Sequence, residues 1–444
     1  MTYPEALSRL LSLRGGEQAG MRPGLERVGV LLEALGHPER RYEIVQVGGT
    51  NGKGSVAVMV ASILKALGQR VGLYTSPHLC SFRERIRVDG VPVSQDDVAD
   101  SVDALGTLIA RLDATMFEAV TAIALDHFAR AGVAWAVLEV GMGGRLDATT
   151  VGRPRAEVIT RIDYDHQAFL GWRLEEIARE KAAIIRSGRA VAAAQAPEVT
   201  QILVGRARET GVPLWIHGRE LGAKVRSRDL SGQRVDFSGP GWALADCSVP
   251  LLGGFQAENS LLAVAAVKAL AASRLGADDA TIRQGLARVK WPGRFQLIRR
   301  DPWVVLDGAH NPAGAQALAA ALEEHFPGAP KTLIIGISAD KDKAGILKVL
   351  APLATRLILT ASSNPRAAPP DDLRALLPPS EGRVELAVDP DRALALALDP
   401  PLTPVICIAG SLFLVADVLA RATGGRDIPC EIERGADSID SLFL

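Results

Sequence analysis

A glycine-rich segment near residue 50 constrains the fold more than any other part of the chain. The sequence VGGTNGKGS follows a predicted strand over 42–47 and opens a predicted helix over 55–67. Backbone N–H groups of such a loop, with the helix N-terminus behind them, form a cradle for anions. Lys53 would give a positive charge to the β- and γ-phosphates, and Ser55 a hydroxyl to Mg²⁺. The segment favours nucleotide binding, although Gly54 separates these two residues, and a plain turn with an exposed lysine is the alternative.

Short apolar segments alternate with helical segments after this loop. Further strands are predicted over 71–74, 134–140 and 157–162, and helices over 118–130 and 174–185. Strands that alternate with helices are typical of parallel α/β architecture. We therefore expect an α/β fold, with a P-loop-type parallel-sheet ATPase domain and a smaller Rossmann-like C-terminal domain.

The sequence pattern changes twice in the second half of the chain. Residues 218–249 carry short apolar stretches between Gly, Ser and Pro, which indicates a small antiparallel insertion before a helix over 259–272. The sequence KWPGRF ends a helix, and a second strand–helix alternation follows it, with strands over 303–306, 332–337, 356–360 and 405–409. We expect an ATP-binding domain over 1–290, a Rossmann-like domain over 291–430 and a tail over 431–444.

Composition excludes several classes of protein. The 444 residues are 48% hydrophobic, which argues against disorder, and the net charge of −1 provides no global attraction to nucleic acid or acidic membranes. The N-terminus lacks the apolar core of a signal peptide, and no apolar run reaches the roughly 20 residues that span a bilayer. Four scattered cysteines without a CxxC pair suggest unpaired thiols in a reducing compartment. We expect a soluble cytoplasmic protein.

Two candidate ligands follow predicted strands of the first half. Glu139 ends the strand AWAVLEV, where a carboxylate is costly unless it is paired, so it is a candidate Mg²⁺ ligand. A salt bridge to Arg145 is the equally weighted alternative. His166, in the sequence DYDH after the next strand, could bind a metal or move a proton, but a lone loop histidine is more often structural.

Lys181 lies on the apolar stripe of the helix predicted over 174–185. A lysine at such a position snorkels, pairs or is modified, and snorkelling is the default. A buried lysine that loses its proton could instead react with carbon dioxide, and the resulting carbamate anion could bind Mg²⁺.

Two residues of the second half complete the candidates. Asp307 ends the strand before GAHNP, at the kind of position where ligands bind in open α/β sheets. Arg294 lies at the predicted domain boundary and could stabilise charge on a transferring phosphoryl group. Taken singly, each is as readily a turn residue or a surface arginine.

Together these residues resemble the folylpolyglutamate synthase and dihydrofolate synthase family of the Mur ligase superfamily. The similar motifs, in the family's order, are GTNGKGS (49–55), SPHL (76–79), RERIRVDG (83–90), LEVGMGGRLDAT (138–149), REKAAII (179–185), PGRFQ (292–296), DGAHNP (307–312) and GSLFLV (410–415). The resemblance covers nearly the whole chain.

The resemblance implies a role for each matched position. For ATP it implies Asn51, Gly52, Lys53, Gly54, Ser55, Asn259, Arg294 and Asp307. For Mg²⁺ it implies Ser76, Glu139 and His166, and it makes Lys181 a carbamylated lysine. The pterin-side pocket would comprise Leu25, Glu26, Thr115, Met116, Phe117, Glu118, Leu146, Asp147 and Ala148, and the glutamate side His310 and Ser411. Lys53, Lys181, His166 and Arg294 would be the catalytic group.

Three positions depart from the family pattern. Gln167 stands where the family usually has Thr, Ala183 replaces a usual Gly, and Met116 occupies a usually aromatic position. The first two lie near the implied metal ligands, and the third weakens the preference for a pterin.

The resemblance implies ATP-dependent amide ligation. The γ-phosphate would activate a carboxylate of dihydropteroate or a folate as an acyl phosphate, and the amine of L-glutamate would then attack it. Small molecules would be the only partners, without nucleic acid or membrane, and we expect a monomer. Another Mur-type amino-acid ligase and a non-catalytic nucleotide-binding switch are the alternatives, with a kinase as a weaker third. No asparagine precedes a lysine, so a GTPase-type NKxD motif is absent from the sequence.

Overall fold

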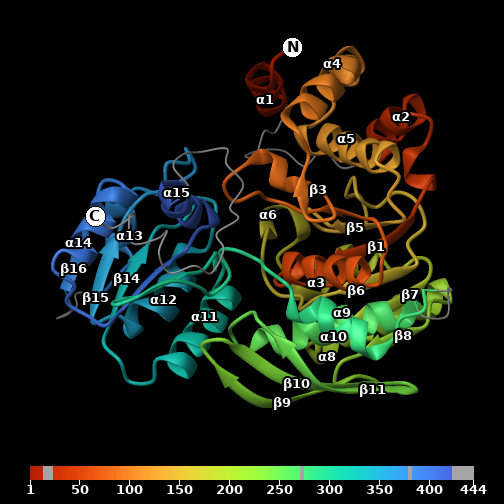
Figure 1. The fold of residues 1–444 in the computed structure, drawn as a ribbon. Coiled ribbons are helices and arrows are strands. Elements are labelled where there is room, and N and C mark those ends of the chain that lie inside the picture. The colour runs from red at the N-terminus through yellow and green to blue at the C-terminus, as the bar shows by residue number, and fades with distance from the viewer. Residues whose placement is uncertain (14–23, 271–274, 379–382, 423–444) are drawn as a thin grey trace.

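The computed structural model describes residues 1–13, 24–270, 275–378 and 383–422. It contains an eight-stranded sheet, a three-stranded sheet beside it and a separate six-stranded sheet, all with packed helices (Figure 1). We call the first two sheets with their helices the large lobe, and the six-stranded sheet with its helices the small lobe. The predicted α/β class is confirmed. No helix among the described residues is long and apolar enough to cross a membrane.

The eight-stranded sheet has the order β4-β3-β2-β5-β1-β6-β7-β8 and is parallel from β2 to β8. The antiparallel strands β3 and β4 form one edge. Its strands are β1 (Glu43–Gly48), β2 (Val71–Tyr74), β3 (Ile86–Val88), β4 (Val91–Pro92), β5 (Trp135–Glu139), β6 (Ala156–Ile159), β7 (Arg189–Ala192) and β8 (Leu214–Ile216). The strands β1, β5 and β6 are central, so their carboxyl ends meet at one edge of the lobe.

Helices cover both faces of this sheet. Residues Val45 and Val47 of β1 face α3, α9 and α10, whereas Ile44 faces the opposite side, because side chains alternate along a strand. On the α3 side lie α3 (Lys53–Ala66), α9 (Phe255–Leu270) and α10 (Asp279–Ala287). On the other side lie α1 (Tyr3–Ser12), α2 (Glu26–Ala34), α4 (Gln95–Arg111), α5 (Met116–Arg130), α7 (Leu174–Ala182) and α8 (Pro197–Thr210), with the short α6 (Gln167–Leu170) nearby.

The three-stranded sheet confirms the predicted antiparallel insertion. It has the order β11-β10-β9, with β9 (Gly222–Asp229), β10 (Gly232–Gly239) and β11 (Trp242–Val249). Val235 and Phe237 of β10 pack into the same apolar core as α9. This insertion is therefore part of the large lobe rather than a separate unit.

The small lobe is built on a sheet of order β12-β13-β17-β14-β15-β16, which is parallel except for β12. Its strands are β12 (Gln296–Arg300), β13 (Trp303–Leu306), β14 (Lys331–Ile335), β15 (Arg356–Leu359), β16 (Arg383–Leu386) and β17 (Val405–Ala409). The apolar cores on its two faces include α11 (Pro312–His325), α12 (Lys343–Leu350) and α13 (Pro370–Ala375) on one face, and α14 (Pro390–Leu398) and α15 (Leu412–Ala422) on the other.

Several predicted boundaries move by a few residues. The helix expected over 259–272 begins at Phe255, and the helix expected over 174–185 ends at Ala182. Cys247 and Cys407 are free and buried as expected, but Cys80 is disulfide-bonded, so the expectation of unpaired thiols is wrong there. The predicted tail over 431–444 lies outside the described residues.

An added methyl group should have opposite effects on the stability of the fold at two glycines. A Cβ on Gly72 of β2 would lie 2.6 Å from Phe128, whereas a Cβ on Gly205 of α8 would meet nothing within 4 Å. We expect Gly72→Ala to destabilise the fold by about 1–3 kcal/mol through overpacking, and Gly205→Ala to stabilise it by about 0.5–1 kcal/mol through helix propensity. Thermal melting of both variants checks this, and equal shifts would contradict the packing argument.

Candidate active site

The glycine-rich loop leaves β1 at Gly48 and enters α3 at Lys53. Gly49 and Gly52 have φ angles of 130° and 95°, and α3 begins with the left-handed Gly52 as its N-cap. A Cβ would lie 2.0 Å from Thr160 at Gly49 and 2.5 Å from Asn259 at Gly52. Both the backbone angle and the space therefore require glycine, and the loop lies tightly between β6 and α9.

Lys53 is held inside this loop. Its Nζ donates a hydrogen bond to the Thr50 carbonyl at 2.9 Å. Burial lowers its pKa, while the nearby carboxylates Glu139 and Asp165 act in the opposite direction. The exposed lysine of the alternative interpretation is therefore wrong. Gln256 of α9 donates to the Ser55 hydroxyl at 3.4 Å and accepts from Asn259 at 2.9 Å, which ties both of these residues to the loop.

Glu139 ends β5 as a buried carboxylate. One of its oxygens accepts a hydrogen bond from the Ser76 backbone N–H at 3.0 Å. Burial raises its pKa, against the opposing charges of Lys53 and Arg294. Arg145 instead pairs with Glu180 at 2.9 Å, so the salt bridge considered for Glu139 is wrong.

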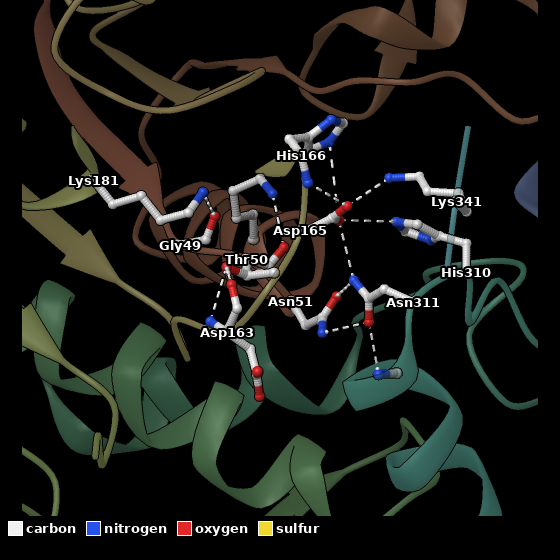
Figure 2. Close-up of polar contacts among 12 residues, drawn as sticks. Gly49, Thr50, Asn51, Asp163, Asp165, His166, Lys181, His310, Asn311 and Lys341 are labelled. Atoms are coloured by element: carbon white, nitrogen blue, oxygen red, sulfur yellow. Dashed lines mark hydrogen bonds and ion pairs between the residues drawn. The ribbon is translucent and has the colours of Figure 1, made fainter. Parts of the chain in front are cut away.

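Lys181 does not snorkel to solvent. It is 4% exposed, and its Nζ donates to the Gly49 carbonyl at 2.9 Å (Figure 2). Burial, together with the positive charge of Lys53, lowers its pKa to about 7. A substantial fraction of its amine is therefore neutral near pH 7.

Polar residues join the two lobes beside this loop. Asn51 and Asn311 exchange two hydrogen bonds, each 3.0 Å long. Asp165 accepts from Lys341 at 2.6 Å and from Asn311 at 3.1 Å, and the rings of His166 and His310 lie 3.9 and 3.8 Å from it (Figure 2). We call these residues the interlobe joint.

Buried charges define the electrostatics of the interlobe joint. Desolvation acts to raise the pKa of Asp165, but its interactions with His166, Lys341 and His310 outweigh that effect and lower the pKa. Desolvation lowers the pKa of His166 to about 3 and of His310 to about 4. Both imidazoles are therefore neutral near pH 7, and Lys341 is the cation that pairs with Asp165.

Arg294 and Asp307 lie on the small-lobe side of the site. Asp307 accepts hydrogen bonds from the Phe295 and Ala309 N–H groups, each at 2.8 Å, and thereby holds the segment next to Arg294. A Cβ on Gly308 would lie 2.0 Å from the Arg294 guanidinium, so the arginine lies directly on that backbone. Burial lowers the pKa of Arg294 and raises that of Asp307; the Asp307 carboxylate is buried, whereas Arg294 is half-buried.

An open hollow of about 420 Å³ lies where the lobes meet. The large lobe lines it with Asp163, Tyr164 and Gln167, and the small lobe with Pro312, Ala313, Gln316 and Asp342. Among the described residues, no group of three or more His, Cys, Asp or Glu side chains is placed to hold a metal ion.

Residues 47–267 match the family model of the Mur ligase middle domain, and residues 293–412 match that of the Mur ligase glutamate ligase domain. The chain is 35% identical over 437 residues to folylpolyglutamate synthase of Lacticaseibacillus casei, with 96% of this chain and 100% of that relative covered. It is 32% identical to the dihydrofolate synthase/folylpolyglutamate synthase of Bacillus subtilis, with 92% and 97% covered. The chain belongs to the folylpolyglutamate synthase/dihydrofolate synthase family of Mur ligases.

A solved structure agrees with this assignment. Mycobacterium tuberculosis folylpolyglutamate synthase complexed with ADP has a TM-score of 0.86 and 34% identity to this chain, with 96% of this chain and 99% of that chain covered. The chain spans 52% of a bifunctional folylpolyglutamate synthase/dihydropteroate synthase from Haloferax volcanii. The resemblance inferred from the motifs is therefore confirmed, and the protein is a Mur-type ligase.

The predicted pterin-side residues of this ligase differ in burial, and three of them have hydrogen-bond partners within the protein. Thr115 and Glu118 bond each other as the capping box of α5, and Glu118 also pairs with Arg27 at 2.8 Å. Asp147 accepts from the Met142 and Thr149 N–H groups, each at 2.9 Å, and so shapes its own loop. Met116 and Ala148 are buried in the core, Leu25, Phe117 and Leu146 are half-buried, and Glu26 is exposed.

The two predicted glutamate-side residues also have internal partners. The His310 ring nitrogen Nδ1 lies 2.8 Å from the Gly308 carbonyl, and the ring faces Asp165 across the interlobe joint. Ser411 is buried, and its hydroxyl accepts from the Phe413 N–H at 3.1 Å at the start of α15.

Sequence reasoning missed Lys341 and the pairing of Asn51 with Asn311. Lys341 follows β14 within the sequence ADKDK, at the carboxyl end of a strand of the small lobe. Its position after a predicted strand could have marked it as a candidate site residue. Its contact with Asp165 could not be predicted, because that contact depends on how the two lobes meet.

Burial of Lys181 should make the free energy of unfolding depend on pH. Its pKa of about 7 lies below the ordinary 10.5, so the unfolded chain binds more protons between these values and burial of the lysine destabilises the fold most at low pH. We expect the stability of Lys181→Met relative to the parent to be about 2 kcal/mol more favourable at pH 7 than at pH 9. Urea denaturation at both pH values measures this difference, and a pH-independent effect would contradict the buried amine.

Proposed function

We propose that this ligase joins L-glutamate to dihydropteroate, to a reduced folate, or to both, in an ATP-dependent reaction through an acyl phosphate. The observation that carries this proposal is the interlobe joint, where the phosphate-type loop of the large lobe meets the 307–311 loop of the small lobe. Full-length similarity to folylpolyglutamate and dihydrofolate synthases supports this reaction over the alternative ligase and switch.

The chemistry needs an activated carboxylate. A free carboxylate is a poor electrophile, because its leaving group would be oxide. Attack of the carboxylate on the γ-phosphate of ATP gives an acyl phosphate and ADP, and attack of the neutral glutamate amine then gives the amide and releases inorganic phosphate. The protein contributes charge stabilisation and positioning rather than a nucleophile.

The phosphate site of this proposal has two cations. Lys53 within the loop and Arg294 on the Gly308 backbone approach the site from the two lobes, and both are half-buried. In such surroundings their charges act more strongly on phosphate than they would in water. Asn51, Gly52, Gly54, Ser55, Asn259 and Asp307 hold the loop and the nucleotide in this assignment.

The proposed Mg²⁺ ligands are Ser76, Glu139 and His166. Glu139 fits, because it is a buried carboxylate that accepts from the backbone N–H of Ser76 and lies within range of the positive charges of Lys53, Arg294 and Arg85. His166 is neutral and also near Lys53, so its imidazole can donate a lone pair. When bound, Mg²⁺ would neutralise phosphate charge, and oxygen ligands are those it prefers.

We propose carbamylation for Lys181. Its neutral amine can form a C–N bond to carbon dioxide and release one proton to solvent, and the resulting carbamate anion would lie near the positive Lys53. Native mass spectrometry in bicarbonate and in bicarbonate-free buffer tests this, with an added mass expected only in bicarbonate and only when Lys181 is present.

The acceptor would lie on the side of Leu25, Glu26, Thr115, Met116, Phe117, Glu118, Leu146, Asp147 and Ala148, and glutamate on the side of His310 and Ser411. In this proposal the domains are 1–290 and 291–430, with a tail over 431–444, and the enzyme acts as a monomer on small molecules. Closure of the lobes would exclude water from the acyl phosphate.

We expect Lys53→Ala to lower ligation at least about 100-fold, because the phosphate loop loses its internal charge. The matched control is Lys65→Ala on the exposed face of the same helix, which should retain activity. The assay incubates each protein with ATP, glutamate and either dihydropteroate or tetrahydrofolate, and detects the amide by mass. Unchanged ligation by Lys53→Ala would exclude Lys53 from the phosphate site. Release of ADP by the parent enzyme without formation of an amide would favour the alternative function, a nucleotide-binding switch.

A further inference from the structure

A chain of buried and half-buried hydrogen bonds runs from β6 to the 141–150 loop. It begins at Glu157, whose carboxylate accepts from the Ser187 N–H at 2.8 Å and from the Arg186 N–H at 3.4 Å. Arg186 donates to the Gln46 amide oxygen at 3.0 Å and also to the carbonyls of Gly152 and Val151. The turn that follows the Lys181 helix is thereby connected to the centre of the large sheet.

Gln46 connects this turn to two threonines. Its amide nitrogen donates to Thr150 at 2.9 Å and to Thr149 at 3.3 Å. The orientation of the amide is determined, because an arginine can only donate and must therefore face the amide oxygen. Gln46 is completely buried in β1, where an apolar residue would avoid the cost of burying an amide.

The two threonines hold the loop in turn. The Thr149 hydroxyl donates to Asp147 at 2.5 Å, and the Thr150 hydroxyl donates to the Gly144 carbonyl at 2.6 Å. Asp147 accepts from the Met142 N–H at 2.9 Å, which closes the loop on itself.

Both sides of the loop touch the proposed site. A Cβ on Gly144 would lie 2.7 Å from the Glu180 carbonyl and 3.2 Å from the Lys181 carbonyl. A Cβ on Gly141 would lie 2.5 Å from the Phe117 ring. The loop therefore fills the space between the Lys181 helix and α5 without clearance, and a small shift would change both contacts.

We propose that Gln46 is a positioning residue that sets the 141–150 loop and, through it, the binding of the acceptor substrate. The side-chain hydrogen-bond partners of Gln46 are Arg186, Thr149 and Thr150, none of which is among the residues proposed to bind ATP, Mg²⁺ or the acceptor. The part of this inference that concerns the acceptor rests on the proposed function, whereas the part that concerns loop geometry does not.

The test compares Gln46→Met, which keeps the side-chain length and removes the amide, with the parent enzyme. We expect the KM for the acceptor to rise at least fivefold, while the KM for ATP and kcat change less than twofold. Hydrogen–deuterium exchange of the 142–150 amides should accelerate in the same variant, and this readout does not require activity. Gln46→Glu keeps an oxygen that faces Arg186, adds a charge that pairs with this arginine, and removes the donors to the threonines. It should therefore also raise the KM for the acceptor more than the KM for ATP, and it serves as the test variant if Gln46→Met does not fold.

Thr332→Val is the matched control. It removes a buried 2.8 Å hydrogen bond to Thr403 in the small lobe, so it should lower the melting temperature without raising the acceptor KM. Unchanged 142–150 exchange in the Gln46 variants, or an equal rise in the KM for ATP and for the acceptor, would overturn the inference. If the parent forms no amide with any acceptor, the proposed function fails, and the exchange measurement alone decides the positioning role.

Discussion

The close approach of the glycine-rich loop to β6 and α9 is the constraint on which the rest of the site depends. No side chain fits at Gly49 against Thr160 or at Gly52 against Asn259. This contact places the Gly49 carbonyl where the buried Lys181 amine can donate to it. The loop is therefore held in one conformation, with the Thr50 and Asn51 N–H groups donating to the Arg161 carbonyl. In the proposed function, this fixed conformation would favour preorganised phosphate binding at the start of α3.

The interlobe joint adds a second constraint. Asn311 both donates to Asn51 and Asp165 and accepts from Asn51 and from the Gly314 N–H, so its amide is fully satisfied across the lobes. A buried polar group that lost its partner would cost about 1–3 kcal/mol. Because a change in how the lobes meet would break these hydrogen bonds, they favour one relative orientation of the lobes. That orientation brings Arg294 toward the charges of Glu139 and Lys53.

Local sequence patterns predicted much of this site, and contacts between distant segments were the part they could not predict. The strand–loop–helix around Lys53 and the burial of Glu139 follow from chain-local signals: glycine spacing and an apolar strand. Snorkelling of Lys181 and pairing of Glu139 with Arg145 were wrong, because the Gly49 carbonyl and Glu180 supply the actual partners. These partners lie on segments that only the folded sheet brings together, as does Lys341 with Asp165. The site residue roles stay predictions.

The proposed mechanism requires that a carboxylate of the acceptor takes the γ-phosphate at the interlobe joint before glutamate attacks. The most direct measurement follows a heavy oxygen isotope placed in the acceptor carboxylate during turnover with ATP and glutamate. We expect one labelled oxygen to appear in the released inorganic phosphate, because the acyl phosphate transfers it when the amide forms. Amide formation with unlabelled phosphate would contradict an acyl phosphate and with it the proposed mechanism.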